Sequence, residues 1–245
     1  MTANLESWLP PSPGPAARGT VILLPGRGEH AGVYERFGRR LAFDAYAVHA
    51  LSVAPEDDPA SLRDQVSALA AEAVAPVVLA GSDTGALHAL ALVIGEKVDV
   101  EGLLLAATPG ASAELTESPE WERELALRSS CPTHQGRLTD DESFHRGSLF
   151  DPIPGHLSAF LDLDESEYEA AGPTLVVHGA ADLLAPPALA TKLVSRLPQA
   201  ELVLVVDAPH DVLNDATHRS VAAAIVQWLE RLRAGAPFAP IIENA

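Results

Sequence analysis

The stretch 75–94 constrains the fold more than any other part of this sequence. Residues 77–80 form a short apolar run rich in β-branched side chains, which is typical of a buried strand. Gly-Ser-Asp-Thr-Gly follows at 81–85, and 86–94 has the apolar composition of a buried helix. A strand that passes through such a pentapeptide into a helix predicts a sharp turn. Asp83, its central residue, would then lie at the carboxyl end of a strand.

Gly81 and Gly85 flank Asp83 at a distance of two residues on each side. A Cβ atom at either position would crowd a sharp turn, so this spacing predicts a nucleophile elbow. In such a turn, the central side chain is presented to the reacting group and backbone N–H groups point toward it. Two other interpretations stay open. A frame shifted by one residue would make Ser82 the nucleophile, and an ordinary glycine-rich turn would carry no chemistry.

The length and composition indicate a globular protein with one core. The chain has 245 residues, of which 47% are hydrophobic, and a mean hydropathy of +0.12. Its formal charge of −18 makes nucleic acids and anionic membrane surfaces poor partners. No run of about 18 apolar residues is present, so we expect no membrane insertion.

Cys131 is the single cysteine, so the fold does not depend on an internal disulfide. Residues 1–14 lack the basic and apolar regions of a signal peptide, which favours a cytoplasmic protein. We expect a small-molecule substrate and no cofactor, and the sequence leaves the oligomeric state open.

Apolar runs alternate along the chain with segments of helical periodicity. The predicted strands are 20–24, 45–51, 77–80, 100–107, 173–177 and 202–206, and the predicted helices are 31–43, 59–74, 86–94, 186–197 and 213–233. This alternation predicts an α/β fold with a mostly parallel sheet and helices on both faces.

The periodicity breaks down between the strands that end near 107 and begin near 173. We interpret 111–171 as a small cap or lid inserted into a core made of 19–110 and 172–236. The proline-rich segment 1–18 is expected to be an N-terminal arm, with Trp8 as its candidate anchor, and 237–245 a C-terminal tail.

Three chemically useful side chains each follow a different predicted strand: Asp83, Asp182 and His210. The carboxyl ends of parallel strands meet at one edge of the sheet, where functional groups gather in such folds. These side chains are therefore expected to cluster. Asp207 is an alternative acid, although it precedes His210 too closely to be preferred.

From residue 20 to the last helix, the chain resembles the α/β-hydrolase fold superfamily, whose nucleophile, acid and histidine occur in the same order. Pro-Gly-Arg-Gly-Glu-His at 25–30, followed by Tyr34, resembles the oxyanion loop of monoacylglycerol-lipase and lysophospholipase-like members. The segment 208–215 resembles their histidine loop. Lipase-like members carry Ser at the elbow, whereas Asp83 is similar to the elbow residue of epoxide hydrolases and haloalkane dehalogenases.

The resemblance implies that Asp83 is the nucleophile, His210 the base and Asp182 the residue that orients His210. It also implies an oxyanion hole formed by the backbone N–H groups of Arg27 and Thr84. A carboxylate is already an anion at neutral pH, so it needs no base in order to attack carbon. His210 would then activate the water that hydrolyses the resulting ester.

The positions of other residues indicate further candidates. Arg27 could bind an anionic substrate, although a surface role is favoured for it. Trp121, Phe144 and Phe150 fall in the predicted cap and are candidates for the substrate pocket, although packing alone would also explain them. The histidines of the cap match no metal-ligand spacing, so we expect no metal site; they are His134, His145 and His156.

Three functions follow from these residues. The first is a hydrolase that forms an ester on Asp83 with an epoxide, an organohalide or a related small electrophile. The second is a lipase- or esterase-like hydrolase of carboxylic esters or thioesters with an atypical Asp elbow. The third is a non-catalytic ligand-binding protein, which the presence of both His210 and Asp182 disfavours.

Overall fold

The computed structural model describes residues 5–110, 120–235 and 238–242 of the chain. Seven strands form one sheet in the order β1-β3-β2-β4-β5-β6-β7. The strands are β1 (Leu5–Trp8), β2 (Gly19–Leu24), β3 (Tyr46–Leu51), β4 (Val77–Ser82), β5 (Gly102–Ala106), β6 (Pro173–Gly179) and β7 (Gln199–Val205). All neighbouring pairs are parallel except β1 with β3. The predicted α/β-hydrolase fold with a mostly parallel sheet is confirmed.

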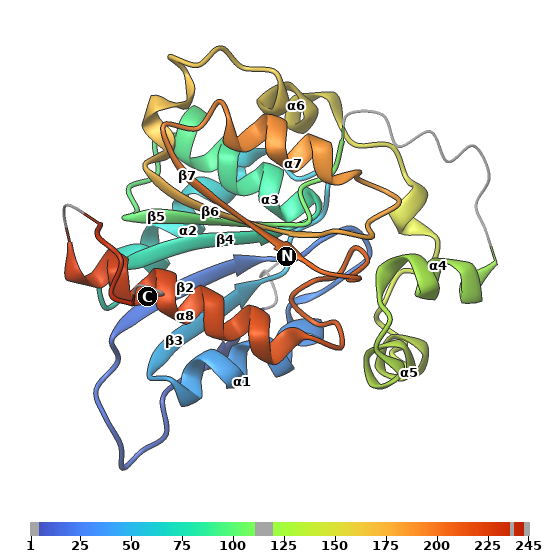
Figure 1. Ribbon diagram of the computed structural model, residues 1–245, viewed down its shortest axis with the longest axis horizontal. Helices are drawn as coiled ribbons and strands as arrows, with labels where there is room; N and C mark the ends of the chain where they lie inside the picture. The colour runs from blue at the N-terminus through green and yellow to red at the C-terminus, as the bar shows by residue number, and fades with distance from the viewer. Residues whose placement is uncertain (1–4, 111–119, 236–237, 243–245) are drawn as a thin grey trace.

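The helices cover both faces of the sheet, as Figure 1 shows. One face carries α1 (Glu35–Phe43) and α8 (His218–Ala234), and the other carries α2 (Pro59–Ala71), α3 (Thr84–Leu90) and α7 (Pro187–Val194). Short 3-10 segments lie at Ala31–Tyr34, Ser148–Phe150, Ala159–Leu161 and Tyr168–Ala171, and a π-helical turn at Ala91–Gly95 extends α3.

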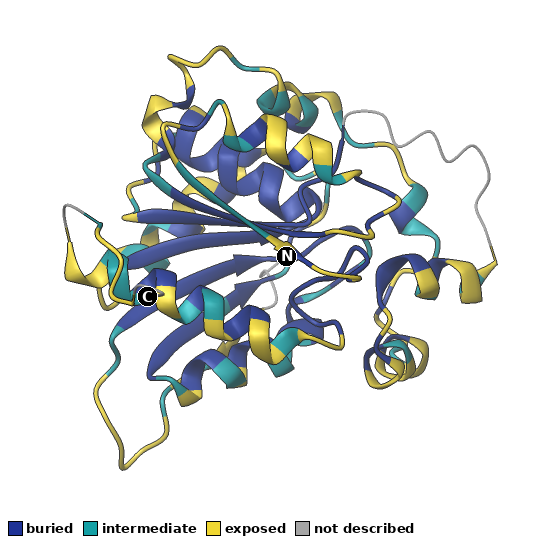
Figure 2. Ribbon diagram, in the orientation of Figure 1, coloured by how far each residue is buried: buried dark blue, intermediate teal, exposed yellow. Residues whose placement is uncertain are grey.

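Alternate side chains of the central strands enter two separate apolar cores. On β2, Val21 and Leu23 pack in the layer beneath α1 and α8, whereas Ile22 and Leu24 pack in the layer beneath α2 and α3. Every residue of β2, β4 and β5 is buried, and the centre of the sheet is dark blue in Figure 2. Burial on both faces explains why these strands are continuous apolar runs.

Two segments differ from the sequence-based prediction. Within the predicted arm, Leu5–Trp8 forms β1 and pairs with β3. The last helix begins at His218, not at 213, because turns hold the residues before it: Asn214 N–H donates to the Asp211 carbonyl, and His218 N–H to the Asp215 carbonyl.

The segment between β5 and β6 corresponds to the predicted cap, and the part numbered 111–119 lies outside the described residues. The described part of this segment contains α4 (Trp121–Arg128), α5 (Pro132–Asp140) and α6 (Gly155–Ser158). In Figure 1, α4 and α5 lie beyond one end of the strands, while α6 lies over α3 on the helical layer. Hydrogen bonds from Asp211 N–H to the Arg128 carbonyl and from His210 N–H to the Leu127 carbonyl join α4 to the segment after β7.

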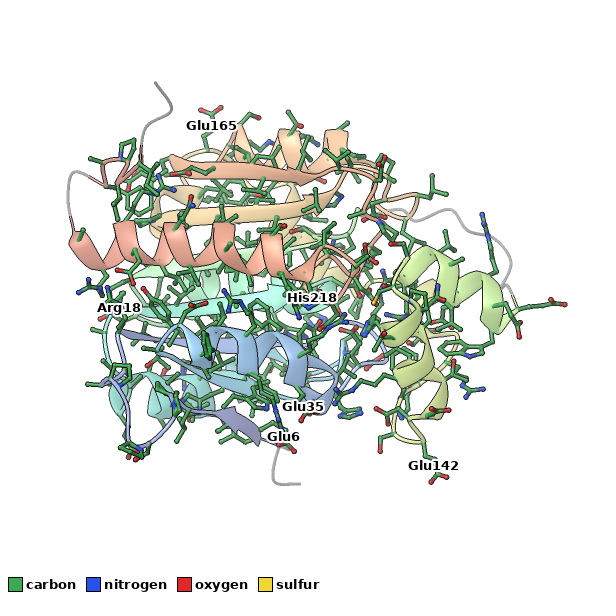
Figure 3. All side chains as sticks on the ribbon, turned by 60° about the horizontal axis from the view of Figure 1, so that its bottom comes forward. Glu6, Arg18, Glu35, Glu142, Glu165 and His218 are labelled. Atoms are coloured by element: carbon green, nitrogen blue, oxygen red, sulfur yellow. The ribbon has the colours of Figure 1, made fainter. Side chains whose placement is uncertain are left out.

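Acidic side chains are spread over the surface. Glu6, Glu142 and Glu165 are exposed and project outward from separate regions in Figure 3. Among the described residues, no helix combines the length and the apolar character that a membrane span requires.

The glycines at the turn after β4 generate a stability prediction. A Cβ atom on Gly81 would lie 2.1 Å from the Gly85 carbonyl oxygen, whereas one on Gly136, in α5, would meet nothing within 4 Å. We expect Gly81→Ala to lower the free energy of unfolding by about 3 kcal/mol or more, because backbone must move. Gly136→Ala should be neutral or stabilising by up to about 1 kcal/mol. Urea unfolding of both variants measures this, and equal effects would contradict the turn geometry.

Candidate active site

Asp83 sits at the turn between β4 and α3 with φ 50° and ψ −123°. This positive-φ conformation is strained for a residue with a side chain and is typical of functional turns. Ser82 is the last residue of β4, so the strained turn is centred on Asp83 and not on Ser82. The frame predicted with Asp83 at the centre therefore matches the backbone, and the shifted frame does not.

His210 and Asp182 lie beside this turn, from the loops that follow β7 and β6. His210 Nδ1 and Asp182 Oδ2 are 2.8 Å apart and hydrogen-bonded. The other carboxylate oxygen of Asp182 accepts hydrogen bonds from the backbone N–H groups of Leu184 and Ala185, at 2.9 and 3.0 Å. These backbone bonds fix the carboxylate, which in turn fixes the imidazole.

The second imidazole nitrogen of His210 faces the elbow. His210 Nε2 lies 3.4 Å from Asp83 Oδ1, slightly beyond an ordinary hydrogen bond. The structure thus brings together the three side chains that the sequence predicted to converge, and Thr84 opens α3 directly after Asp83.

Arg27 makes the closest contacts with Asp83. Its Nε donates to Asp83 Oδ2 and its Nη2 donates to Asp83 Oδ1, both at 2.8 Å, which makes a bidentate ion pair. The backbone N–H of Arg27 also donates to Asp83 Oδ2, at 2.9 Å. Its remaining nitrogen, Nη1, donates to the Asp151 carbonyl at 2.8 Å. The surface role favoured for Arg27 from the sequence is wrong, because the residue is only 1% exposed.

The backbone N–H of Arg27 was predicted to belong to an oxyanion hole. In this structure, the Asp83 carboxylate itself accepts a hydrogen bond from that group. Arg27, Asp83, Asp182 and His210 are all between 1% and 3% exposed, so the site is closed to solvent.

Charge pairing sets the protonation of these groups. Burial opposes the ionisation of Asp83, but Arg27 and His210 outweigh burial and hold the Asp83 pKa well below its usual range. Burial likewise opposes a charged His210, but Asp182 and Asp83 raise the His210 pKa to about 10. Burial also opposes ionisation of Asp182, whose pKa is nevertheless lowered, chiefly by His210.

The lowered pKa values of Asp83 and Asp182 and the raised pKa of His210 favour the charged forms of these groups at neutral pH. Together with the Arg27 guanidinium, cations and anions then alternate in the order Arg27, Asp83, His210 and Asp182. Their charges balance, which is the condition under which buried ions are tolerated. A serine at the elbow would leave His210 with one carboxylate neighbour in place of two. The aspartate thus places a second carboxylate beside His210 and contributes to the raised pKa of this histidine.

A second group of buried charges adjoins the site, and it was not predicted from the sequence. Arg128, on α4, donates to the Arg27 carbonyl at 2.9 Å and to Glu124 at 3.1 Å. It also lies 3.8 Å from both Glu29 and Asp211. Glu29 accepts from the Gly26 N–H. Glu124 precedes Arg128 by four residues on α4, but the other partners come from two distant segments, which contain Arg27 and Glu29 in one and Asp211 in the other. The local sequence pattern therefore does not show the cluster.

The aromatic candidates for the substrate pocket lie on the α4 side. The rings of Trp121 and Phe144 are 5.7 Å apart, and the Arg128 guanidinium lies 4.8 Å from the Phe144 ring centre. Phe150 packs against a separate small cluster that contains Leu127. Phe144 thus approaches the site through Arg128, whereas Trp121 contacts the Phe144 ring and Phe150 packs against the cluster of Leu127, Leu149 and Leu184.

The histidines of this segment have other contacts. His134 Nε2 lies 3.4 Å from Asp211, the N–H of His145 donates to the Gly28 carbonyl, and His156 is in α6. Across the described ranges, no group of three or more His, Cys, Asp or Glu side chains has an arrangement that would hold a metal ion.

The model of the alpha/beta hydrolase family matches residues 21–224, which is most of the chain. The protein belongs to this family. The match includes Arg27, Asp83, Asp182 and His210, and it identifies the protein as a hydrolase at the level of the family. Comparison with curated protein sequences gives no significant match.

Solved structures of alpha/beta hydrolases share the fold at low sequence identity. The monoacylglycerol lipase of Paleococcus ferrophilus is 19% identical, with a TM-score of 0.72 over 95% of this chain and 100% of that chain. A soluble variant of monoglyceride lipase from Saccharomyces cerevisiae, in complex with a substrate analog, is 15% identical, with a TM-score of 0.75 over 93% and 91%. A meta-cleavage product hydrolase from Pseudomonas fluorescens IP01 is 16% identical, with a TM-score of 0.68 over 91% and 92%.

A double-mutant cycle tests the ion pair between Arg27 and Asp83. Arg27→Met removes the bidentate partner of the buried Asp83 carboxylate, which then faces only His210 and a backbone N–H, and should lower the free energy of unfolding by about 3–5 kcal/mol. Adding Asp83→Asn should recover part of this loss, because the second charge is also removed. Urea unfolding at pH 7 of the two single variants and the double variant gives the coupling energy. Additive effects would contradict a direct ion pair.

Proposed function

We propose that this alpha/beta hydrolase cleaves carboxylic esters or thioesters, with Asp83 as the attacking carboxylate. His210, oriented by Asp182, acts first as an acid and then as a base. The observation that carries the proposal is the 3.4 Å contact between Asp83 Oδ1 and His210 Nε2. The lowered pKa of Asp83 and the raised pKa of His210 favour an ionised carboxylate beside a protonated imidazole. A nucleophile that is already charged, beside an acid that is already protonated, is the starting state that such a reaction requires.

In the first step, Asp83 Oδ1 bonds to the acyl carbon of the substrate and the bond to the leaving oxygen or sulfur breaks. His210 Nε2 gives its proton to that leaving group. The product of this step is a mixed anhydride between the acyl group and Asp83. The Arg27 N–H, which already bonds to a carboxylate oxygen of Asp83, is positioned to stabilise negative charge on oxygen during the attack.

In the second step, the now neutral His210 takes a proton from water, and the hydroxide oxygen bonds to the acyl carbon. Asp83 leaves as a carboxylate, the carboxylic acid is released, and His210 is protonated again. Asp182 keeps Nδ1 hydrogen-bonded throughout, so only Nε2 exchanges protons with the reacting groups.

Acyl substrates are preferred over the epoxides and organohalides that the sequence favoured first. Several of the proteins with similar structures are named as lipases or esterases. Epoxide opening of the expected kind needs tyrosine hydroxyls near the carboxylate, and the three tyrosines are engaged elsewhere. Tyr34 donates to Glu29, Tyr46 to Glu230, and Tyr168 to the Phe160 carbonyl.

Trapping the acyl group tests the role of Asp83. We expect His210→Gln to become acetylated by 4-nitrophenyl acetate, because nitrophenolate leaves without an acid, and then to hydrolyse the anhydride slowly. Rapid acid quenching followed by mass analysis should place one acetyl group on the peptide that contains 81–85. The matched control is His210→Gln combined with Asp83→Asn, which should stay unmodified.

The outcomes separate the three candidate functions. An unmodified Asp83 in an enzyme that turns over esters would contradict the nucleophilic role. Adducts from epoxides or alkyl halides, without turnover of any ester or thioester, would favour the alkyl-ester mechanism. Tight ligand binding with no turnover of either class would indicate a binding protein.

The pH dependence of ester hydrolysis gives a second test. His210 must start protonated, so kcat/KM should be level through neutral pH and fall as the pH rises through about 10. The low pKa of Asp83 keeps the nucleophile ionised well into the acidic range. A rate that increases as His210 loses its proton would contradict the proposed first step, because it would mean that His210 begins as a base.

A further inference from the structure

Arg27 and His210 act on the same acyl group in the proposed reaction, yet they come from distant parts of the sheet. Arg27 lies in the loop after β2 and His210 in the loop after β7, and β4, β5 and β6 separate these two strands. The sheet alone therefore does not hold the two loops against each other. In the resting state Asp83 joins them, because its carboxylate contacts the Arg27 guanidinium and lies 3.4 Å from His210 Nε2.

The first step of the proposed reaction breaks this connection. Acylation removes the negative charge of Asp83, and His210 gives up its proton in the same step, so the charge-assisted contacts through Asp83 are lost. The second step nevertheless needs the Arg27 N–H at the acyl oxygen and His210 Nε2 at the attacking water. The register of the two loops then depends on contacts that acylation leaves unchanged.

The end of α4 supplies such contacts. Carbonyl groups in the last turn of a helix have no partner within the helix. The Leu127 carbonyl accepts from the His210 N–H at 3.2 Å, and the carbonyl of Arg128 accepts from the Asp211 N–H at 2.7 Å. The side chain of Arg128 reaches the other loop, because its Nη2 donates to the Arg27 carbonyl at 2.9 Å. One residue thus bonds to the His210 loop through its backbone and to the Arg27 loop through its guanidinium.

Carboxylates that take no part in the reaction hold the Arg128 side chain. Glu124, one turn earlier on α4, accepts from Arg128 Nε at 3.1 Å and also from the Gly147 N–H. Glu29 and Asp211 each lie 3.8 Å from Arg128 Nη1, and the Arg128 side chain is only 1% exposed. None of these partners forms a bond or exchanges a proton in the proposed steps, so they hold the guanidinium in the same place during both.

Resting on the proposed function, we propose that Arg128 is a positioning residue for the acyl-enzyme. It keeps the oxyanion donor of Arg27 and the proton acceptor of His210 in register after Asp83 has lost its charge. Arg128 touches no reacting atom, so it acts through the two loops. The second step depends on it more than the first step, in which the Asp83 carboxylate still joins these loops.

Arg128→Lys tests this role while keeping a cation beside the buried carboxylates. A lysine ammonium does not reproduce the planar fork that binds Glu124 and the Arg27 carbonyl together. With 4-nitrophenyl acetate, rapid acid quenching and mass analysis of the peptide that contains 81–85 give the rates of acetylation and deacetylation. We expect acetylation to stay within about threefold of the wild-type rate and deacetylation to slow by about tenfold or more.

Arg137→Lys is the matched control. Arg137, on α5, also joins this segment to the chain after β2, because its Nη2 donates to the Gly32 carbonyl at 2.9 Å and to Glu35 at 2.7 Å. These bonds bypass Arg27 and His210, so both rates should stay near those of the wild type. Equal effects of Arg128→Lys on the two steps, or the same selective slowing by Arg137→Lys, would overturn the positioning role.

Hydrogen exchange tests the same link without turnover. Asp83→Asn removes the charge that acylation removes, so the two loops should then depend more on Arg128. We expect Arg128→Lys to speed amide exchange in the segments 25–30 and 208–213 by about tenfold or more in the Asp83→Asn background, and by less than about threefold in the wild-type background. Equal acceleration in the two backgrounds would contradict the inference.

The two measurements separate this inference from the proposed function. Acetylation of Asp83 in the wild type, with equal effects of Arg128→Lys on both steps, overturns the inference and leaves the proposed function standing. Background-dependent exchange, with no acetyl group on Asp83 during ester turnover, supports the link through Arg128 and overturns the proposed function.

Discussion

The bidentate ion pair between Arg27 and Asp83 is the interaction on which the site depends. An aspartate at a strained, fully buried turn would be costly without a cation, and Arg27 provides that cation from the loop after β2. The same pair places a carboxylate oxygen on the Arg27 N–H and turns the other oxygen toward His210. This ion pair thus stabilises the elbow and lowers the pKa of Asp83, and the Asp83 carboxylate in turn helps to raise the pKa of His210.

The site is coupled to the segment between β5 and β6 through Arg128. This buried guanidinium donates a hydrogen bond to the carbonyl of Arg27 and lies 3.8 Å from the carboxylate of Asp211. Asp211 directly follows His210 in the chain. The end of α4 is also bonded to the His210 backbone. Movement of α4 would therefore disturb the loop of Arg27 and the loop of His210 together, which links access to the site with its internal geometry.

Much of the fold follows from the sequence, because apolar runs and short-range turn chemistry are local signals. The elbow could be predicted from Gly81 and Gly85, and the convergence of Asp83, Asp182 and His210 from their positions after strands. The burial of Arg27 and its pairing with Asp83 could not, because these residues are 56 positions apart. The contacts of Arg128 with Arg27 and Asp211 could not be predicted either, because they also join distant positions. The helix α8 begins later than predicted because turns before His218 compete with the helical periodicity.

The charge state of His210 in the resting protein tests the account most directly. Nitrogen-15 NMR of the histidine rings, with His210→Gln used to assign the resonance, distinguishes an imidazolium from either neutral tautomer. At pH 8, well above the pKa of an unperturbed histidine, the account predicts that both nitrogens of His210 carry protons and that the ring titrates with a midpoint of about 10. A neutral His210 at pH 8 would contradict it, because Asp83 would then lack the acid on which the proposed chemistry depends.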